Sequence, residues 1–242
     1  MHIYTYNNPD ELSYAVADWM INQISETVKK TGRFTIALSG GSTPQRLYSI
    51  LATEPYSQKI DWSKLHIFYG DERVVPFEDT RNNAKMSYDT LLNHVPVPAS
   101  QIHIMKTDIG PEEAARQYEA ILHEYFDHSG TTFDLTLLGM GDDGHTLSVF
   151  PGSELVDDKA GWARAIWVPA QDMYRITLTP ELVNKSAVVA FLTTGANKSA
   201  PLKQVIKGAP NPHQYPSQLI KPTNGELYWF VDKEAAKELS EP

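Results

Sequence analysis

The chain has 242 residues, a formal net charge of −9 and no cysteine. Without cysteine, disulfides, thiolate zinc sites, iron–sulfur clusters and a cysteine nucleophile are excluded. The acidic balance and the lack of any Lys/Arg run argue against a nucleic-acid partner, because that binding depends on cations that neutralise phosphates.

Helix and strand patterns alternate along the whole chain. Apolar residues recur at every fourth position from Leu12 to Val28 and Gly32 follows, which predicts an amphipathic helix that ends at the glycine. Apolar runs predict strands at residues 33–39, 64–70, 101–105, 133–139, 163–170, 174–179, 187–193 and 227–231. Further helices are expected up to Leu51, at residues 82–95 and 111–128, from Pro180, near Ser199 and after Asp232.

This alternation predicts an α/β fold with a largely parallel sheet covered by helices on both faces. We expect one domain over residues 1–242, with residues 151–163 as an irregular surface excursion. The N-terminus lacks a signal-peptide pattern, and the longest apolar run, residues 187–192, is too short to span a bilayer. We therefore expect a cytoplasmic protein with no membrane partner.

In largely parallel α/β sheets, ligands bind beyond the carboxyl ends of the strands, so the loops there are the first candidates for a site.

The stretch "LSGGSTP", residues 38–44, follows one predicted strand. Gly40 and Gly41 permit a close backbone approach, Ser42 and Thr43 offer hydroxyls, and Pro44 suits the first position of a helix. A helix N-terminus with these features favours an anion such as phosphate. The plainer alternative is that Ser42 or Thr43 only caps the helix. The loop is not a Walker A motif, since G-x-x-x-x-G-K-[ST] is absent.

Charged residues stand at the ends of other predicted elements. "GDERVV" places Asp71, Glu72 and Arg73 after a strand, Arg175 lies at the start of another strand, and Lys198 lies at or just before a helix N-terminus. A cation at a helix N-terminus is unfavourable unless an anion lies between them. The alternative is that these are solvated surface charges.

The stretch "GMGDDGHTLSVFPG", residues 139–152, fits G-x-G-x-x-G, the spacing of a dinucleotide-binding turn. That turn needs a following helix and then an acid about 20 residues on. Here Pro151 and Gly152 interrupt the helix, and the next strand reaches its acid only at Asp172. The nicotinamide interpretation is therefore disfavoured. His145, with Asp143 two residues before it, is instead suited to move protons near neutral pH.

Neither of two other motifs indicates a site. "HEYFDH" is similar to H-E-x-x-H, but His123 and His128 are five residues apart and diverge on a helix. The nucleophile elbow G-x-S-x-G does not occur in the chain. We expect no metal site and no serine nucleophile.

The order of "SGGSTP", "GDERVVP", "GMGDDGHTLSVFPG" and "RITLT…NKSAPL" closely resembles the 6-phosphogluconolactonase family, a branch of the glucosamine-6-phosphate isomerase/deaminase-like superfamily. The likeness runs from about residue 33 to about residue 208. Asp142 replaces a frequent Pro and Leu147 a frequent Ala. The resemblance implies a modified Rossmann-like fold that hydrolyses 6-phospho-D-glucono-1,5-lactone, in the oxidative pentose phosphate pathway, with no metal and no cofactor.

The resemblance also implies roles for single residues. His145 is similar to the family's catalytic histidine; Arg73, Arg175 and Lys198 to ligand-binding cations; and the loop of Gly40, Gly41, Ser42 and Thr43 to part of a phosphate site. On chemical grounds, Asp143 is expected to orient His145, and Asp71 to organise Arg73 or position water. Backbone N–H groups of the turn around Gly144, or Arg73, are candidates to bind the oxyanion and so the substrate.

Two other functions are alternatives. An amino-sugar phosphate deaminase resembles this pattern but has a glutamate five residues after the histidine, where this chain has Phe150. A non-catalytic sugar-phosphate sensor usually carries a further DNA-binding or partner module, and the first thirty residues instead predict one amphipathic helix. The expected partner is a small sugar phosphate lactone, bound by a monomer or a small homo-oligomer.

Overall fold

Six parallel strands form the central sheet of the computed structural model, which describes residues 1–239. Across the sheet they are β1 (His2–Tyr6), β9 (Glu226–Asp232), β8 (Val188–Thr193), β5 (Leu135–Leu138), β2 (Phe34–Leu38) and β3 (Leu65–Tyr69). Every residue of β2, β5 and β8 is buried, because both faces of a parallel sheet are covered. The predicted α/β class with a largely parallel sheet is confirmed.

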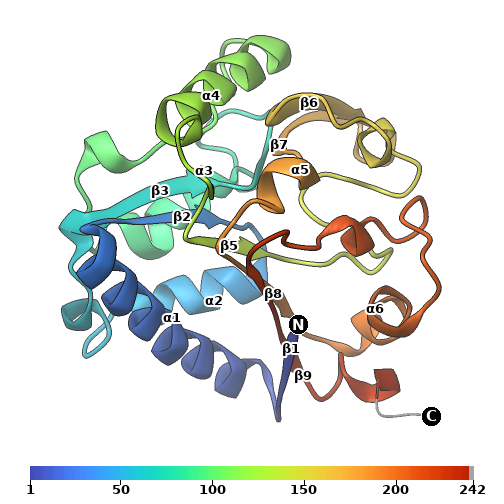
Figure 1. Ribbon diagram of the computed structural model, residues 1–242, viewed down its shortest axis with the longest axis horizontal. Helices are drawn as coiled ribbons and strands as arrows, with labels where there is room; N and C mark the ends of the chain where they lie inside the picture. The colour runs from blue at the N-terminus through green and yellow to red at the C-terminus, as the bar shows by residue number, and fades with distance from the viewer. Residues whose placement is uncertain (240–242) are drawn as a thin grey trace.

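Helices cover both faces of this sheet. They are α1 (Pro9–Thr31), α2 (Ser42–Leu51), α3 (Asn83–Ser87), α4 (Pro111–Phe126), α5 (Pro180–Val183) and α6 (Ser199–Lys207). Helices α1 and α2 lie on one face and α4 on the other (Figure 1). Helix α1 is capped by Asn8, whose side chain accepts from the Glu11 backbone N–H, and ends at Gly32 with a φ of 81°. Within residues 1–239, no helix is both long enough and apolar enough to cross a bilayer.

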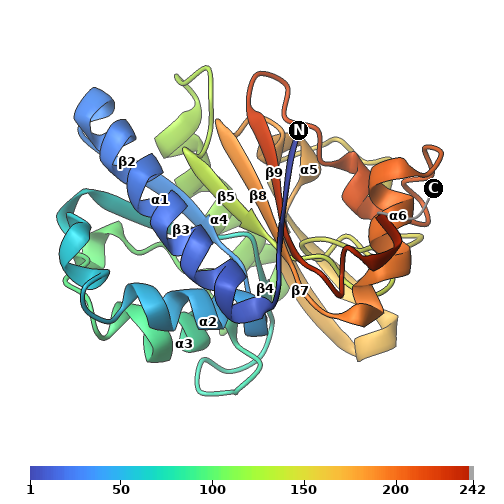
Figure 2. The same cartoon turned by 90° about the horizontal axis from the view of Figure 1, so that it is seen from below.

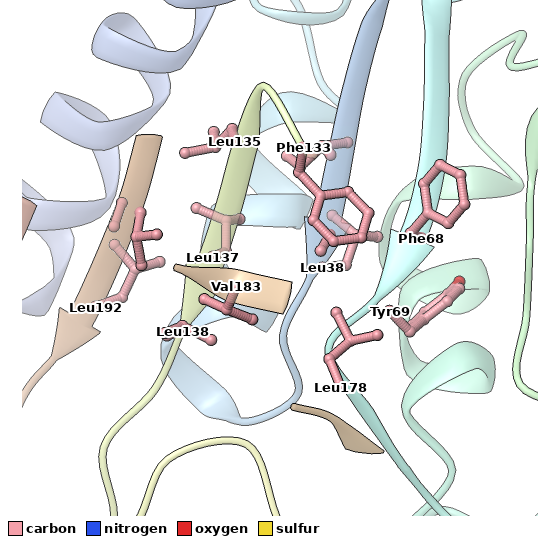
Figure 3. Packing of buried hydrophobic residues seen from close by; sticks show 14 of the residues in the cluster. Leu38, Phe68, Tyr69, Phe133, Leu135, Leu137, Leu138, Leu178, Val183 and Leu192 are labelled. Carbon is pink, nitrogen blue, oxygen red and sulfur yellow. The ribbon is translucent and has the colours of Figure 1, made fainter. Parts of the chain in front are cut away.

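A second, antiparallel sheet of three strands was not expected from the sequence. It consists of β4 (Asp71–Arg73), β7 (Met173–Leu178) and β6 (Ala163–Val168). Leu178 N–H donates to Gly70 O at 2.8 Å, so the last residue of β7 is joined to the residue that follows β3. Leu178 and Val183 pack against side chains of the central sheet (Figure 3). The small sheet thereby places "DER" beside a strand more than 100 residues later in the chain.

Three predicted elements are different in the structure. Residues 101–105 are not a strand: a 3₁₀ turn covers Ala99–Gln101, and the segment joins β3 through an isolated bridge between Ile67 and Ile102 and a hydrogen bond from His103 N–H to Ile67 O. The helix predicted at residues 82–95 is α3 followed by a π-helical turn, Tyr88–Leu92. After Asp232 the chain forms turns and a 3₁₀ helix, Lys237–Leu239, and not an α-helix.

Strand β1, at one edge of the central sheet, was not predicted from the sequence either. Strand β1 pairs in parallel with β9 from His2 to Tyr6, so the first residues form the sheet edge (Figure 2). Residues 151–163 are irregular, as expected, but are not merely a surface excursion. Leu155 and Val156 lie in a 3₁₀ turn and are buried.

Candidate active site

A cavity of about 240 Å³ opens beyond the carboxyl ends of β2, β5 and β8. It brings together seven of the residues predicted for the site: Gly40, Gly41, Asp71, Arg73, His145, Arg175 and Lys198. Ser42, Thr43, Asp143 and Gly144 are not among its lining residues. The segments that line the cavity come from both sheets, so the predicted loops do converge although they are far apart in the chain.

Two arginines face each other in this cavity. Arg73 in β4 is the cross-strand partner of Arg175 in β7, so both side chains leave the same face of the small sheet. Among residues 1–239, the buried Nε atoms of both arginines lack a hydrogen-bond partner. Like charges directly opposite each other are destabilising, and an unpaired buried donor adds to the cost. The arrangement therefore favours an anion between or beside them.

Arg175 is more deeply buried than Arg73. It is 5% exposed, and burial lowers the pKa of its guanidinium to about 10, although the Asp71 charge opposes that effect. Its Nη2 donates to Gln171 Oε1, and its Nη1 lies 3.6 Å from Asp71 Oδ2. Lys198 is the N-cap of α6, as expected, and makes no ion pair with residues 1–239.

The glycine loop opens helix α2 as predicted, but the hydroxyls do not cap it. Gly41 is the N-cap, with a φ of 103°, and α2 has no side-chain cap within the described part of the chain. The Thr43 hydroxyl lies 2.8 Å from that of Thr194, and Ser42 is exposed. The capping alternative is wrong for both residues. The first N–H groups of α2 remain suited to an anion, because no described side chain hydrogen-bonds to that end of the helix.

His145 is held by Asp143, as expected. His145 Nδ1 lies 2.6 Å from Asp143 Oδ1, which also accepts from the His145 backbone N–H at 3.0 Å. Burial alone raises the pKa of Asp143, but these hydrogen bonds and the histidine charge outweigh it, and the pKa is lowered. An ionised Asp143 accepts from Nδ1–H, which leaves Nε2 as the nitrogen that can accept a proton. The Phe150 ring packs on the imidazole, with centroids 4.2 Å apart.

Glycines are required in the turn that carries His145. A Cβ at Gly141 would lie 2.1 Å from His145 Nδ1, so any side chain there would displace the imidazole. Gly144 has a φ of 82°, and its N–H donates to Gly141 O at 3.2 Å. Gly144 O accepts from the backbone N–H and the hydroxyl of Ser217. Gly144 therefore stabilises the turn through these hydrogen bonds and does not line the cavity.

Asp71 and Glu72 have opposite surroundings. Asp71 faces the cavity, and its Oδ2 accepts from the Ser148 hydroxyl at 2.7 Å. Glu72 points the other way, is 1% exposed, and accepts from the backbone N–H groups of Arg73, Asn83 and Ala84. Burial raises the pKa of Glu72 to about 7, against the effect of these hydrogen bonds. Glu72 therefore anchors α3 to β4 and is not a cavity residue.

Sequence reasoning missed several cavity residues. Ser39, Asn83 and Gln171 line the cavity, and the buried Ser148 supports Asp71 from behind. One signal was present: "RNNA" holds two asparagines at a helix start, where a cap needs only one. For Gln171 no local signal existed, since it lies in the connection between β6 and β7. Within residues 1–239, no group of three or more His, Asp or Glu side chains is arranged to hold a metal ion.

Comparisons with known proteins agree with this geometry. The family model of glucosamine-6-phosphate isomerases/6-phosphogluconolactonases matches residues 7–229. The chain is 40% identical to a Nostoc 6-phosphogluconolactonase, over 92% of each chain. It is 39% identical to one from Synechocystis, over 90% of this chain and 89% of that one.

Solved structures show the same likeness. A 6-phosphogluconolactonase from Trypanosoma cruzi matches with a TM-score of 0.86 and 27% identity, over 99% of this chain and 97% of that one. A monomeric glucosamine-6-phosphate deaminase matches with a TM-score of 0.84 at 18% identity, over 98% of this chain and 99% of that one, which shows a shared fold alone. This protein therefore belongs to the glucosamine-6-phosphate isomerase/6-phosphogluconolactonase family.

Proposed function

We propose that the protein hydrolyses 6-phospho-D-glucono-1,5-lactone to 6-phospho-D-gluconate, in the oxidative pentose phosphate pathway. The observation that carries the proposal is the pair Arg73 and Arg175, with unpaired buried Nε atoms in the described structure, in one cavity with His145. A strong anion site beside a proton-transfer group fits a phosphorylated substrate with a reacting centre some distance from its phosphate. The cavity is smaller than the roughly 300–1,000 Å³ of drug-sized pockets, which suits a monosaccharide phosphate.

The phosphate is assigned to the cationic side of the cavity. Arg175 and Lys198 bind it as charged donors, together with the N-terminus of α2. Ser42 and Thr43 lie at that N-terminus but outside the cavity lining, so their part is to shape the loop around Gly40 and Gly41. Binding at the phosphate holds C1 of the lactone in place, and such positioning lowers the barrier before any chemistry starts.

The hydrolysis itself is assigned to His145. Its Nε2 takes a proton from water as the water oxygen bonds to C1, and the carbonyl becomes an oxyanion. We assign the stabilisation of that oxyanion to Arg73, whose side chain lines the cavity. When the C1–ring oxygen bond breaks, His145 returns the proton to the ring oxygen. Asp143 keeps Nδ1 protonated, and Asp71, which lines the same cavity, positions water or organises Arg73.

A deaminase function is less well supported. The position five residues after His145 holds Phe150, whose ring packs on the imidazole, so no acid is available there to assist ring opening.

We further propose that residues 1–242 act as one domain, because the cavity is lined by both sheets. The proposed setting is cytoplasmic, with the protein acting as a monomer or a small homo-oligomer.

The test uses freshly prepared lactone, with acid release followed by a pH indicator against the spontaneous rate. The protein should accelerate acid release and should release no ammonia from glucosamine 6-phosphate. Ammonia release without lactone hydrolysis would replace the lactonase by the deaminase. Binding of the lactone phosphate with neither reaction would favour a sensor.

A further inference from the structure

Asn83 carries an unused hydrogen-bond acceptor into the cavity. It is the first residue of α3, is 4% exposed and lines the cavity. Its Nδ2 donates to the Asp71 backbone oxygen at 2.9 Å. Because a backbone carbonyl can only accept, this bond sets which end of the amide is which. The other end, Oδ1, accepts no hydrogen bond from residues 1–239.

The position of this acceptor is fixed from three sides. The Asn83 backbone N–H donates to the buried Glu72 carboxylate at 2.7 Å, and its side chain is tied to Asp71. On the third side, a Cβ built on Gly40 would lie only 2.1 Å from Oδ1. The amide oxygen therefore rests against the glycine loop, in a position that needs no rearrangement when a ligand arrives.

The cavity needs such an acceptor if a sugar ring enters it. Arg73, Arg175 and Lys198 are donors only, so they can bind a phosphate but cannot accept from a hydroxyl. A ring hydroxyl that loses its water without finding an acceptor weakens binding. Asp71 is one acceptor, and its Oδ2 is already engaged by Ser148. Asn83 Oδ1 is a neutral acceptor. It therefore does not compete with the phosphate for the arginine side chains, as a second carboxylate would.

We propose that Asn83 is a specificity-determining residue whose Oδ1 accepts a hydrogen bond from one ring hydroxyl of the lactone. This inference rests on the proposed function, since it takes the ligand to be a hydroxylated sugar lactone phosphate. A site built to bind a substrate hydroxyl discriminates strongly against the analogue that lacks it, because the buried acceptor is then left unpaired. The discrimination should therefore disappear when the acceptor is removed.

The experiment measures kcat/KM for 6-phospho-D-glucono-1,5-lactone and its 2-deoxy, 3-deoxy and 4-deoxy counterparts. The proteins are the wild type, Asn83→Ala, Asn83→Ser and Asn82→Ala. Asn82 is a matched control: it precedes Asn83, caps α3 through a bond from Lys85 N–H, and lies outside the cavity lining. Thermal unfolding of each protein confirms that it is folded at the assay temperature.

Asn83→Ala should lower kcat/KM for the full lactone by about 10- to 100-fold. For one of the three deoxy lactones, the wild type should already show a loss of that size, and Asn83→Ala should add less than about threefold. Asn83→Ser should behave like Asn83→Ala, and Asn82→Ala should affect all four lactones alike. An equal loss on all four lactones in both Asn83 variants would assign Asn83 a purely structural role and overturn the proposal. Unchanged rates would overturn it as well. If the wild type hydrolyses none of the lactones, the proposed function fails first.

Discussion

Arg73 and Arg175 are direct cross-strand neighbours in the β4–β7 pair, and the described residues leave both of their buried Nε atoms without a partner. Two guanidinium groups in this relation repel each other and hold Nε donors that the described residues do not satisfy. The fold keeps them together through β7, whose Leu178 is anchored in the core. The arrangement is unfavourable without a ligand and favourable with an anionic ligand, as expected of a preorganised anion site.

Replacing Arg175 should therefore separate stability from binding. Arg175→Met removes a buried charge and a like-charge contact, which offsets the loss of the ion pair with Asp71 and the hydrogen bond to Gln171, so the free energy of unfolding without ligand should change by less than about 1 kcal/mol. The affinity for 6-phosphogluconate should fall by about 10- to 100-fold, because hydrogen bonds to charged groups are each worth about 1.5–3 kcal/mol. Calorimetric titration measures the affinity, with Arg116→Met, on the exposed face of α4, as the control. Full retention of affinity would remove Arg175 from the phosphate site.

The imidazole position is tested by one added methyl group. Gly141→Ala places a Cβ within 2.1 Å of the present His145 Nδ1, whereas the Cβ of Gly139→Ala meets Ser39 Oγ at 3.9 Å. The first variant should displace His145 and lower kcat by about 100-fold or more. The second should lose far less, because 3.9 Å is an ordinary contact. Equal kcat values in the two variants would show that the exact ring position does not matter.

Asp143 should affect the chemical step more than substrate binding. Asp143→Ala removes the acceptor 2.6 Å from His145 Nδ1, so the ring loses both its orientation and its preferred tautomer. We expect kcat to fall by about 10- to 100-fold, less than the 10²–10⁴-fold typical of a general base itself. KM should change by less than about threefold. A rise in KM at constant kcat would instead mean that Asp143 contacts the substrate.

Glu72 should make the protein less stable as the pH rises. Burial raises its pKa from 4.5 to about 7 in the folded protein, so the folded state holds this proton more tightly than the unfolded state does. The resulting stabilisation is complete below pH 4.5 and is lost as the pH rises to about 7. The free energy of unfolding should fall by up to about 3 kcal/mol over this range relative to Glu72→Gln, which cannot titrate. Urea unfolding at several pH values measures the difference, and a constant difference would contradict this assignment. Exposed Glu112→Gln is the control.

The sequence predicts best those elements whose pattern is local. Helix α1 follows from apolar residues every fourth position and a terminal glycine, and β2, β5 and β8 follow from apolar runs. Residues 101–105 also carry an apolar pattern, yet they join β3 through an isolated bridge and single hydrogen bonds and not as a strand. Strand β4 has three charged residues and no pattern. It is a strand only because β7 lies beside it, which a local pattern cannot reveal.

For the site, too, local motifs were predictable and tertiary relationships were not. Motifs identified Arg73, His145, Arg175 and Lys198 one by one, and the cavity brings them together. Their mutual geometry depends on the small sheet, which was not foreseen. Gln171 and Asn83 reach the cavity through that sheet and through the anchor at Glu72. Both depend on tertiary contacts that leave no spacing signal in the chain.

The central claim is that His145 moves the proton in lactone hydrolysis, and one measurement tests it most directly. Acid release from fresh 6-phospho-D-glucono-1,5-lactone is followed with wild type and with His145→Ala, each shown to be folded and to bind 6-phosphogluconate. The wild type should exceed the spontaneous rate, and the variant should lose about 10²–10⁴-fold of the enzymatic rate. A variant that binds the product and hydrolyses the lactone as fast as the wild type would contradict the claim.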